Sequence, residues 1–101
     1  KQYAEARAAI TAQPRLERSV NGQELLARIA FQQGDKATAD KIYAGIETTS
    51  DEAKDYLARK AIADRNWVRA RQLTEELLKK YPDQPNLRAS LEAIAKAEAR
   101  K

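Results

Sequence analysis

Pairs of carboxylates are the arrangement in this sequence that could do acid–base chemistry, because two neighbouring acids can act as proton donor and acceptor when their environments separate their pKa values. The pairs are Asp51-Glu52, Glu75-Glu76 and Asp35 with Asp40. Each falls at an expected helix start or on an exposed helix face, where acids cap the helix or are solvated. No pattern predicts a cleft around them. We therefore predict no catalytic residues and a protein that is not an enzyme.

The residues that most metal and cofactor sites use are missing from the sequence. It contains no cysteine and no histidine. This excludes disulfides, a thiolate nucleophile, cysteine-ligated zinc and the usual general base near neutral pH. Gly22, Gly34 and Gly45 are too widely spaced for a phosphate-binding loop. We expect no cofactor and no metal.

An aromatic residue among arginines could bind nucleic acid by stacking on a base and neutralising phosphates. Trp67 has such neighbours in Arg65, Arg69 and Arg71. However, the net charge is only +4, acids and bases are interspersed, and the longest basic runs are pairs such as Lys79-Lys80. A solvated surface explains this pattern better, so nucleic-acid binding stays a rival hypothesis and is not the expected function.

Strong helix formers dominate the sequence, and apolar residues recur at helical spacing throughout. A polar connector is expected at 14–19, and capping boxes are expected at Asn21 with Glu24 and at Thr49 with Glu52. The pattern predicts about six short helices: about 2–13, 21–33, 36–46, 51–63, 67–81 and from Pro85 onward. Their short connections predict antiparallel helical hairpins, an all-α fold. No apolar stretch approaches the roughly 20 residues that a membrane-spanning helix needs, so no direct membrane insertion is expected.

The apolar residues of each expected helix are predicted to face inward. These are Tyr3, Ala6 and Ile10; Leu25, Leu26, Ile29 and Ala30; Ala39, Ile42, Tyr43 and Ile46; Leu57, Ala58, Ala61 and Ile62; Ala70, Leu73 and Leu77; and Leu87, Leu91 and Ile94.

The sequence repeats itself after 31 residues, and small residues and helix breakers repeat together. The matching positions are Glu24/Asp55, Leu26/Leu57, Ala27/Ala58, Arg28/Arg59, Ala30/Ala61, Phe31/Ile62, Asp35/Asn66, Ala39/Ala70, Ile42/Leu73 and Ile46/Leu77. A solenoid explains such a repeat, because each hairpin buries its apolar face against the next copy.

These positions resemble the tetratricopeptide repeat (TPR) family. The best copy carries Leu57-Ala58, Ala61, Trp67, Ala70, Thr74, Leu77 and Pro82. Alanine replaces the usual glycine at Ala27 and Ala58 and the usual aromatic at Ala30 and Ala61, and the repeat is shorter than the family's roughly 34 residues. The resemblance covers about residues 3–82 and implies that Trp67 wedges between helices.

The resemblance implies that the hairpins stack as a right-handed α-α superhelix. Residues 1–14 would then be the second helix of a partial repeat. Residues 20–49 and 50–82 would be repeats, and residues 84–101 would be a capping helix or the start of a further repeat. The chain contains no methionine and begins in mid-pattern, so we expect a fragment of a longer protein.

In TPR arrays the first helix of each hairpin lines a concave groove that holds a partner's helix or extended peptide. The resemblance therefore implies a non-enzymatic scaffold that binds another protein or peptide segment and packs against neighbouring repeats of its parent chain. The groove positions are Asn21, Glu24, Arg28, Phe31, Glu52, Asp55, Arg59 and Ile62. Acid stands four residues before arginine in both copies, so each pair is expected to neutralise the groove, leaving Phe31 and Ile62 as anchors.

The stretch 75–91 is similar to repeats of bacterial envelope proteins, including outer-membrane assembly factors and periplasmic parts of exopolysaccharide exporters. The resemblance implies a periplasmic protein, with the cytoplasm as the alternative. A structural spacer between domains is the other rival to partner binding.

Overall fold

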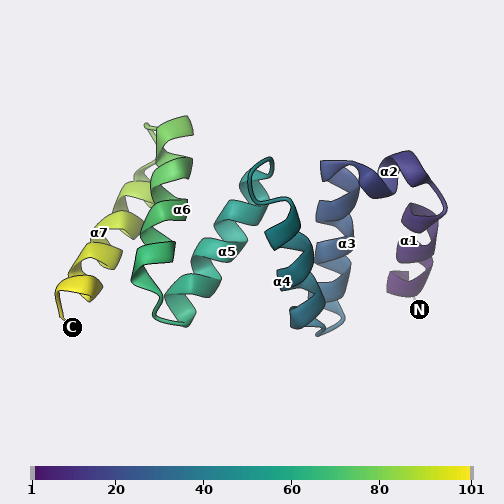
Figure 1. The fold of residues 1–101 in the computed structure, drawn as a ribbon, viewed down its shortest axis with the longest axis horizontal. Helices are drawn as coiled ribbons and strands as arrows, with labels where there is room; N and C mark the ends of the chain where they lie inside the picture. The colour runs from purple at the N-terminus through teal and green to yellow at the C-terminus, as the bar shows by residue number, and fades with distance from the viewer. Residues whose placement is uncertain (1, 101) are drawn as a thin grey trace. The chain divides into compact units, whose positions relative to one another are not determined.

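The structure, a computed structural model, describes residues 2–100, and these form seven α-helices and no strand (Figure 1). The prediction of an all-α fold is confirmed. The helices are α1 (Gln2–Thr11), α2 (Pro14–Arg18), α3 (Val20–Gln32), α4 (Lys36–Gly45), α5 (Asp51–Ala63), α6 (Trp67–Lys80) and α7 (Pro85–Ala99).

The chain divides into two compact units, Lys1–Ala53 and Lys54–Lys101. Unit 1 holds helices α1 to α4 and the first turn of α5, and unit 2 holds the remainder of α5 with α6 and α7.

One helix more is present than the sequence predicted, because residues expected as a connector form α2. Pro14 stands in the first turn of α2, where its fixed φ suits a helix and its missing N–H costs nothing. Gln13 precedes the proline in an extended conformation, with φ −117° and ψ 95°, because the proline ring disfavours helical backbone before it. This ends α1 at Thr11, two residues earlier than predicted.

The helices α3 and α4 of unit 1 pack against each other as an antiparallel hairpin (Figure 1). Gly34 takes the left-handed conformation between them, with φ 85°. The N–H of Asp35 donates to the carbonyl of Ala30 at 2.9 Å, and the Asp35 side chain accepts from the N–H of Thr38 at 3.2 Å. Gly34 therefore ends α3 in the left-handed conformation that glycine adopts freely, and Asp35 caps α4.

Unit 2 contains the matching turn between α5 and α6. The N–H of Asn66 donates to the carbonyl of Ala61 at 2.8 Å, and the Asn66 side chain caps α6 by accepting from Arg69 N–H at 3.3 Å. Arg65 takes the left-handed position, with φ 59°, where the first copy has glycine. The repeat read from the sequence is therefore a repeat of local structure.

The core of unit 2 includes buried Ala61, Ala70 and Ile94, and Trp67 packs against this cluster. α6 and α7 lie side by side, and Arg71 joins them through an ion pair to Glu98, with Nη1 2.5 Å from Oε1. The small side chains of the alanines allow the helices to approach closely, and the larger tryptophan packs against the cluster that they form.

Both expected capping boxes are wrong. Ser19, not Asn21, caps α3, because its hydroxyl accepts from the N–H of Gly22 at 2.9 Å. Ser50, not Thr49, caps the start of α5, because its hydroxyl accepts from the N–H of Ala53 at 3.0 Å. In each case a serine hydroxyl close to the backbone takes the capping position, and the expected glutamate partner binds elsewhere.

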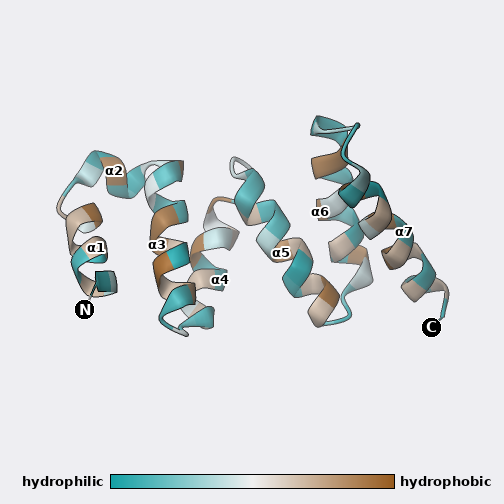
Figure 2. Ribbon diagram, turned by 180° about the vertical axis from the view of Figure 1, so that it is seen from behind, coloured by the Kyte–Doolittle hydropathy of each residue, from teal (hydrophilic) through white to brown (hydrophobic). Residues whose placement is uncertain are grey.

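Most of the expected inward positions are buried or half-buried, and Figure 2 shows apolar and polar segments alternating along α3. Four expectations are wrong. Ala6 is exposed, and Tyr3, Leu25 and Ile62 keep 39%, 37% and 37% of their surface exposed. A helical period fixes which residues share a face, but it does not fix how far the neighbouring helix covers that face.

Candidate binding surfaces

The eight groove residues predicted from the sequence belong to two different units. Asp55, Arg59 and Ile62 lie on the part of α5 that belongs to unit 2. The other five lie in unit 1: Asn21, Glu24, Arg28 and Phe31 on α3, and Glu52 in the first turn of α5. The structure therefore supplies two surfaces, one in each unit, and each has its own chemistry.

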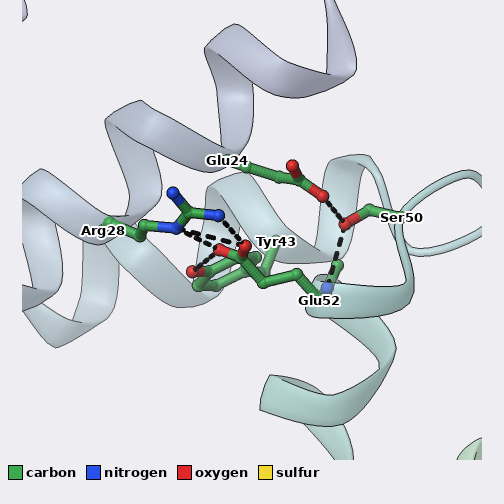
Figure 3. Close-up of polar contacts among 6 residues, drawn as sticks. Glu24, Arg28, Tyr43, Ser50 and Glu52 are labelled. Carbon is green, nitrogen blue, oxygen red and sulfur yellow. Dashed lines mark hydrogen bonds and ion pairs between the residues drawn. The ribbon is translucent and has the colours of Figure 1, made fainter.

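The surface of unit 1 is organised around Glu52 (Figure 3). Its carboxylate accepts two hydrogen bonds from Arg28 Nε, at 2.9 and 3.1 Å, and forms an ion pair with Arg28 Nη2. The hydroxyl of Tyr43 donates to the same carboxylate at 2.6 Å. Because Tyr43 is 4% exposed and the Glu52 side chain 28%, this network joins α3, α4 and the start of α5 at the edge of the core.

A second polar contact lies beside the first (Figure 3). The hydroxyl of Ser50 donates to Glu24 Oε2 at 2.5 Å while it accepts the N–H of Ala53. Ser50 is 1% exposed, so both functions of its hydroxyl are satisfied away from water. Glu24 therefore fastens α3 to the cap of α5.

These contacts perturb the charged groups of unit 1. The hydrogen bonds from Arg28 are the main reason that the pKa of Glu52 is lowered; burial opposes this, and the Tyr43 hydroxyl lowers it further. The pKa of Arg28 is raised, chiefly by the hydrogen bonds that it donates to Glu52. Both groups are therefore held in their charged forms.

The expected pairing of acid and arginine along the helix differs between the copies. Asp55 and Arg59 form the predicted pair in unit 2, with Arg59 Nε 3.0 Å from Asp55 Oδ2. The expected pair of Glu24 with Arg28 is wrong, because Arg28 bonds Glu52 and Glu24 bonds Ser50. A bidentate carboxylate from another helix competes well with an exposed neighbour on the same helix.

The remaining predicted positions of unit 1 lie on the outside of α3. Asn21 is exposed in the first turn. Phe31 keeps 44% of its surface exposed, and Lys36 Nζ lies 5.9 Å from its ring centroid. This cation–π contact places an aromatic ring with an adjacent positive charge near the α3–α4 turn.

Unit 2 has a cleft of about 190 Å³ where the predicted groove residues of α5 gather. Its floor is mainly apolar, and the ion pair of Asp55 with Arg59 stands at its side. The lining residues are Asp55, Ala58, Arg59 and Ile62 of α5, Thr74 and Leu77 of α6, and Asn86, Leu87 and Ser90 of α7. All three predicted groove residues of unit 2 thus line one cleft.

Sequence reasoning missed residues on both surfaces. Tyr43 was expected only in the core, and Ser50 was given no role, because their contacts depend on residues nine and 26 positions away in the sequence. Asn86 and Ser90 of the cleft were not singled out at all. Their spacing of four residues on a helix was the available signal, because it places two polar side chains on one face beside Leu87.

Comparisons with protein-family models, curated proteins and solved structures give no match to this chain. Along residues 2–100 no helix combines the length and the apolar character that crossing a membrane requires.

Proposed function

We propose that the chain is a TPR-like scaffold module, that its hairpins stack as a right-handed superhelix, and that it binds a segment of another protein in its groove. The observation that carries the proposal is the cleft of unit 2. It gathers Asp55, Arg59 and Ile62, which the TPR resemblance implies as groove positions, with residues of α6 and α7.

The repeated turn supports the array. Gly34 and Arg65 share the left-handed conformation, and Asp35 and Asn66 cap the following helices in the same way. The two turns therefore share both their backbone conformation and the way in which the next helix is capped. Hairpins that repeat in this way are the building blocks of solenoids, in which each copy needs a neighbour to cover its apolar face.

The chemistry of the cleft supports a partner with mixed character. Ala58, Leu77 and Leu87 offer an apolar floor for a side chain of the partner. The pair of Asp55 with Arg59 cancels its own charge, and Asn86 and Ser90 supply neutral donors and acceptors. An apolar side chain flanked by uncharged backbone amides suits this site better than a charged peptide end.

The proposal includes a compartment, the periplasm, and a parent protein of the bacterial envelope. The resemblance of the stretch 75–91 to bacterial envelope repeats makes the periplasm the place to look first for the partner, among assembly factors of the outer membrane and exopolysaccharide exporters.

A capture experiment tests the groove. The double variant Arg59→Glu with Ile62→Asp changes two cleft residues that lie on the surface, and Val68→Asp is the matched control, because Val68 is 53% exposed on α6 and is not among the residues that line the cleft. Proteins retained by the immobilised chain are identified by mass spectrometry, and affinity is then measured with the purified partner.

We expect the double variant to lower affinity for the identified partner by at least about tenfold, as for loss of a central interface contact, while Val68→Asp leaves it unchanged. Circular dichroism should show equal helicity in all three proteins. Undiminished affinity of the double variant would sink the groove assignment. A chain that binds no protein in any form would leave a spacer role as the better explanation.

A distance measurement tests the superhelix. The sequence contains no cysteine, so spin labels can be attached to cysteines introduced at Asn21 and Asp55, one in each unit. A stacked array predicts one narrow distance distribution between the labels. A broad distribution would show that the two units move independently and would contradict the proposed stacking.

A further inference from the structure

The depression at the other end of unit 2 is separate from the cleft of the proposed function. It has a volume of about 570 Å³ and is lined by Arg65, Trp67, Ala97 and Arg100. The α5–α6 turn and the C-terminal end of α7 lie at the same end of this unit (Figure 1), which is why residues from both line it. None of these four residues lines the cleft beside Asp55 and Arg59.

The indole of Trp67 gives this depression a fixed wall. Trp67 is the first residue of α6, directly after the capping Asn66, and it packs against the core cluster of Ala61, Ala70 and Ile94. It is nevertheless only half-buried. The chain therefore holds a large aromatic surface in place and leaves part of it open to a ligand.

The charged side chains that line the depression are two arginines, Arg65 and Arg100. Neither Arg65 nor Arg100 makes an ion pair within residues 2–100. The acids closest to them in sequence have other partners, since Asp64 binds Lys60 at 2.9 Å and Glu98 binds Arg71 at 2.5 Å. Two guanidinium groups are thus available to one anionic group, which they can bind with paired hydrogen bonds.

The backbone of Arg65 adds an independent observation. Its φ of 59° is a conformation that residues other than glycine adopt at a cost, and the first copy places Gly34 there with φ 85°. Strain of this kind at a non-glycine residue points to a use for the side chain. Here the side chain carries one of the two charges of the depression.

We propose that this depression, the Trp67 site, binds a small anion carried on a flat apolar body, of which an aromatic carboxylate is the type. The ring lies against the indole of Trp67 and Ala97, and the carboxylate is held by Arg65 and Arg100.

A small anion fits the site better than nucleic acid does. A polyanion needs a row of cations that follows its backbone. Arg71 is one of the arginines that suggested nucleic-acid binding, but it forms an ion pair with Glu98. Lys60 likewise forms an ion pair with Asp64. Of the cations beside Trp67, only Arg65 and Arg100 line the depression.

The fluorescence of Trp67 provides the assay, because it is the single tryptophan of the chain. The full chain is titrated with benzoate, with the uncharged benzamide, and with acetate, which has the charge and no ring. We expect a saturable change with the benzoate, with a Kd of about 1 mM or below, as for a ligand of this size, and a response at least about tenfold weaker with each of the other two.

The variant Arg65→Gly separates binding from folding, because it removes one charge and gives the strained position the residue that the first copy has. We expect it to weaken binding of the benzoate at least about tenfold, as for loss of a charge-assisted contact, while its melting temperature stays equal or rises. Arg15→Gln, an exposed arginine of α2 in the other unit, is the control for the charge change and should bind as the unchanged protein does.

Equal responses to the benzoate and the benzamide would overturn the proposal, and so would undiminished binding by Arg65→Gly. A single-stranded oligonucleotide that quenches Trp67 with steep salt dependence, and that the benzoate does not displace, would show a nucleic-acid site instead. Failure of these tests leaves the proposed groove unaffected, because the cleft variants do not touch this depression.

Discussion

The two hairpin turns of this protein have the same backbone geometry, but the surfaces at the groove positions of the two copies have opposite characters. In unit 1 the positions expected to form a groove are occupied by a network of Glu24, Arg28 and Glu52 with two residues from elsewhere. In unit 2 the equivalent positions Asp55 and Arg59 bind each other and border an open cleft of about 190 Å³. A repeat can thus preserve a scaffold while changing what its surface offers.

The difference follows from three positions outside the repeated motif. Shifting the sequence by one repeat places Thr74 at the position of Tyr43, Tyr81 at that of Ser50 and Asp83 at that of Glu52. The second copy therefore has no phenol hydroxyl at the first of these positions and no serine at the second. The carboxylate at the third, that of Asp83, lies in the turn before α7 and not in the first turn of a helix. Without these partners, Arg59 stays with Asp55 on its own helix.

The largest expected effect comes from a glycine that only the first copy requires. A Cβ on Gly22 would lie 1.6 Å from the carbonyl oxygen of Leu16, whereas Ala53, one repeat later, is accommodated with 0% exposure. We expect Gly22→Ala to destabilise unit 1 by about 2–3 kcal/mol, because α2 must move away from α3. Hydrogen exchange, which reports on each unit separately, should show lost protection in these two helices.

Gly45→Ala is the matched control, because a Cβ there meets nothing within 4 Å. It should leave protection unchanged or raise it slightly. Wild-type protection of α2 and α3 in Gly22→Ala would show that the close approach of these two helices is not needed.

The next effect concerns the buried serine of unit 1. Ser50→Ala removes the cap of α5 and the donor to Glu24 Oε2, so we expect a loss of about 1–2 kcal/mol in the free energy of unfolding. Thr49→Ala, at an exposed neighbour that was the expected cap, should cost far less. Equal losses in urea denaturation would contradict the assignment of the cap to Ser50.

Exchanging the left-handed residues of the two turns tests whether the copies differ in strain. Arg65→Gly should stabilise unit 2 by about 0.5–1 kcal/mol, and Gly34→Arg should destabilise unit 1 by about 1 kcal/mol, because only glycine adopts this conformation freely. Thermal unfolding of both variants checks the opposite signs. Shifts of the same sign would mean that side-chain contacts outweigh backbone conformation at these turns.

The smallest expected effect is a pH dependence of the stability of unit 1. It arises from the contacts of Glu52 with Arg28 and Tyr43, which unit 2 does not have. The lowered pKa of Glu52 means that its contribution to stability is present above the pKa of the unfolded chain, about 4.3. This contribution is lost as the pH falls through the lower pKa of the folded state. Because the Arg28 side chain is 54% exposed, solvent screening limits it to about 0.5–1 kcal/mol.

Glu52→Gln should remove this part of the acid sensitivity, and Glu75→Gln, on an exposed part of α6, serves as its control. Stability is measured by denaturation between pH 7 and pH 3. The same acid-induced loss in Glu52→Gln as in the unchanged chain would mean that the ion pair contributes nothing measurable.

Much of the fold could be predicted because it depends on neighbours in the sequence. Helix periodicity located six of the seven helices, and Gly34-Asp35 and Asn66 marked the turns correctly. The wrong predictions concern positions where two neighbouring residues could each cap or start a helix, and the apolar pattern does not show which of them does so. Ser19 and Ser50 displaced the expected caps, and Pro14 started a helix within an expected connector.

The candidate sites were predictable only in part. The positions of Asp55, Arg59 and Ile62 on one helix face follow from their spacing, and the structure places them along one cleft. The cleft residues Asn86 and Ser90 come from α7. Their spacing places them on one helix face, but it does not indicate which other helix that face meets. The depression beside Trp67 likewise depends on residues far apart in the sequence, because Arg65 comes from the turn before α6 and Arg100 from the end of α7.

The sequence by itself determined the helical class, the repeat and its register, and the positions of both hairpin turns, because each depends on backbone preferences within a few residues. Only the tertiary structure decided which carboxylate Arg28 binds, that Ser50 fastens Glu24, and that the second copy keeps an open cleft. Those contacts depend on which side chains of other helices lie close to these residues in the folded chain. An exposed ion pair between two residues of one helix contributes only a few tenths of a kcal/mol. A carboxylate from another helix that offers better hydrogen-bond geometry therefore displaces it.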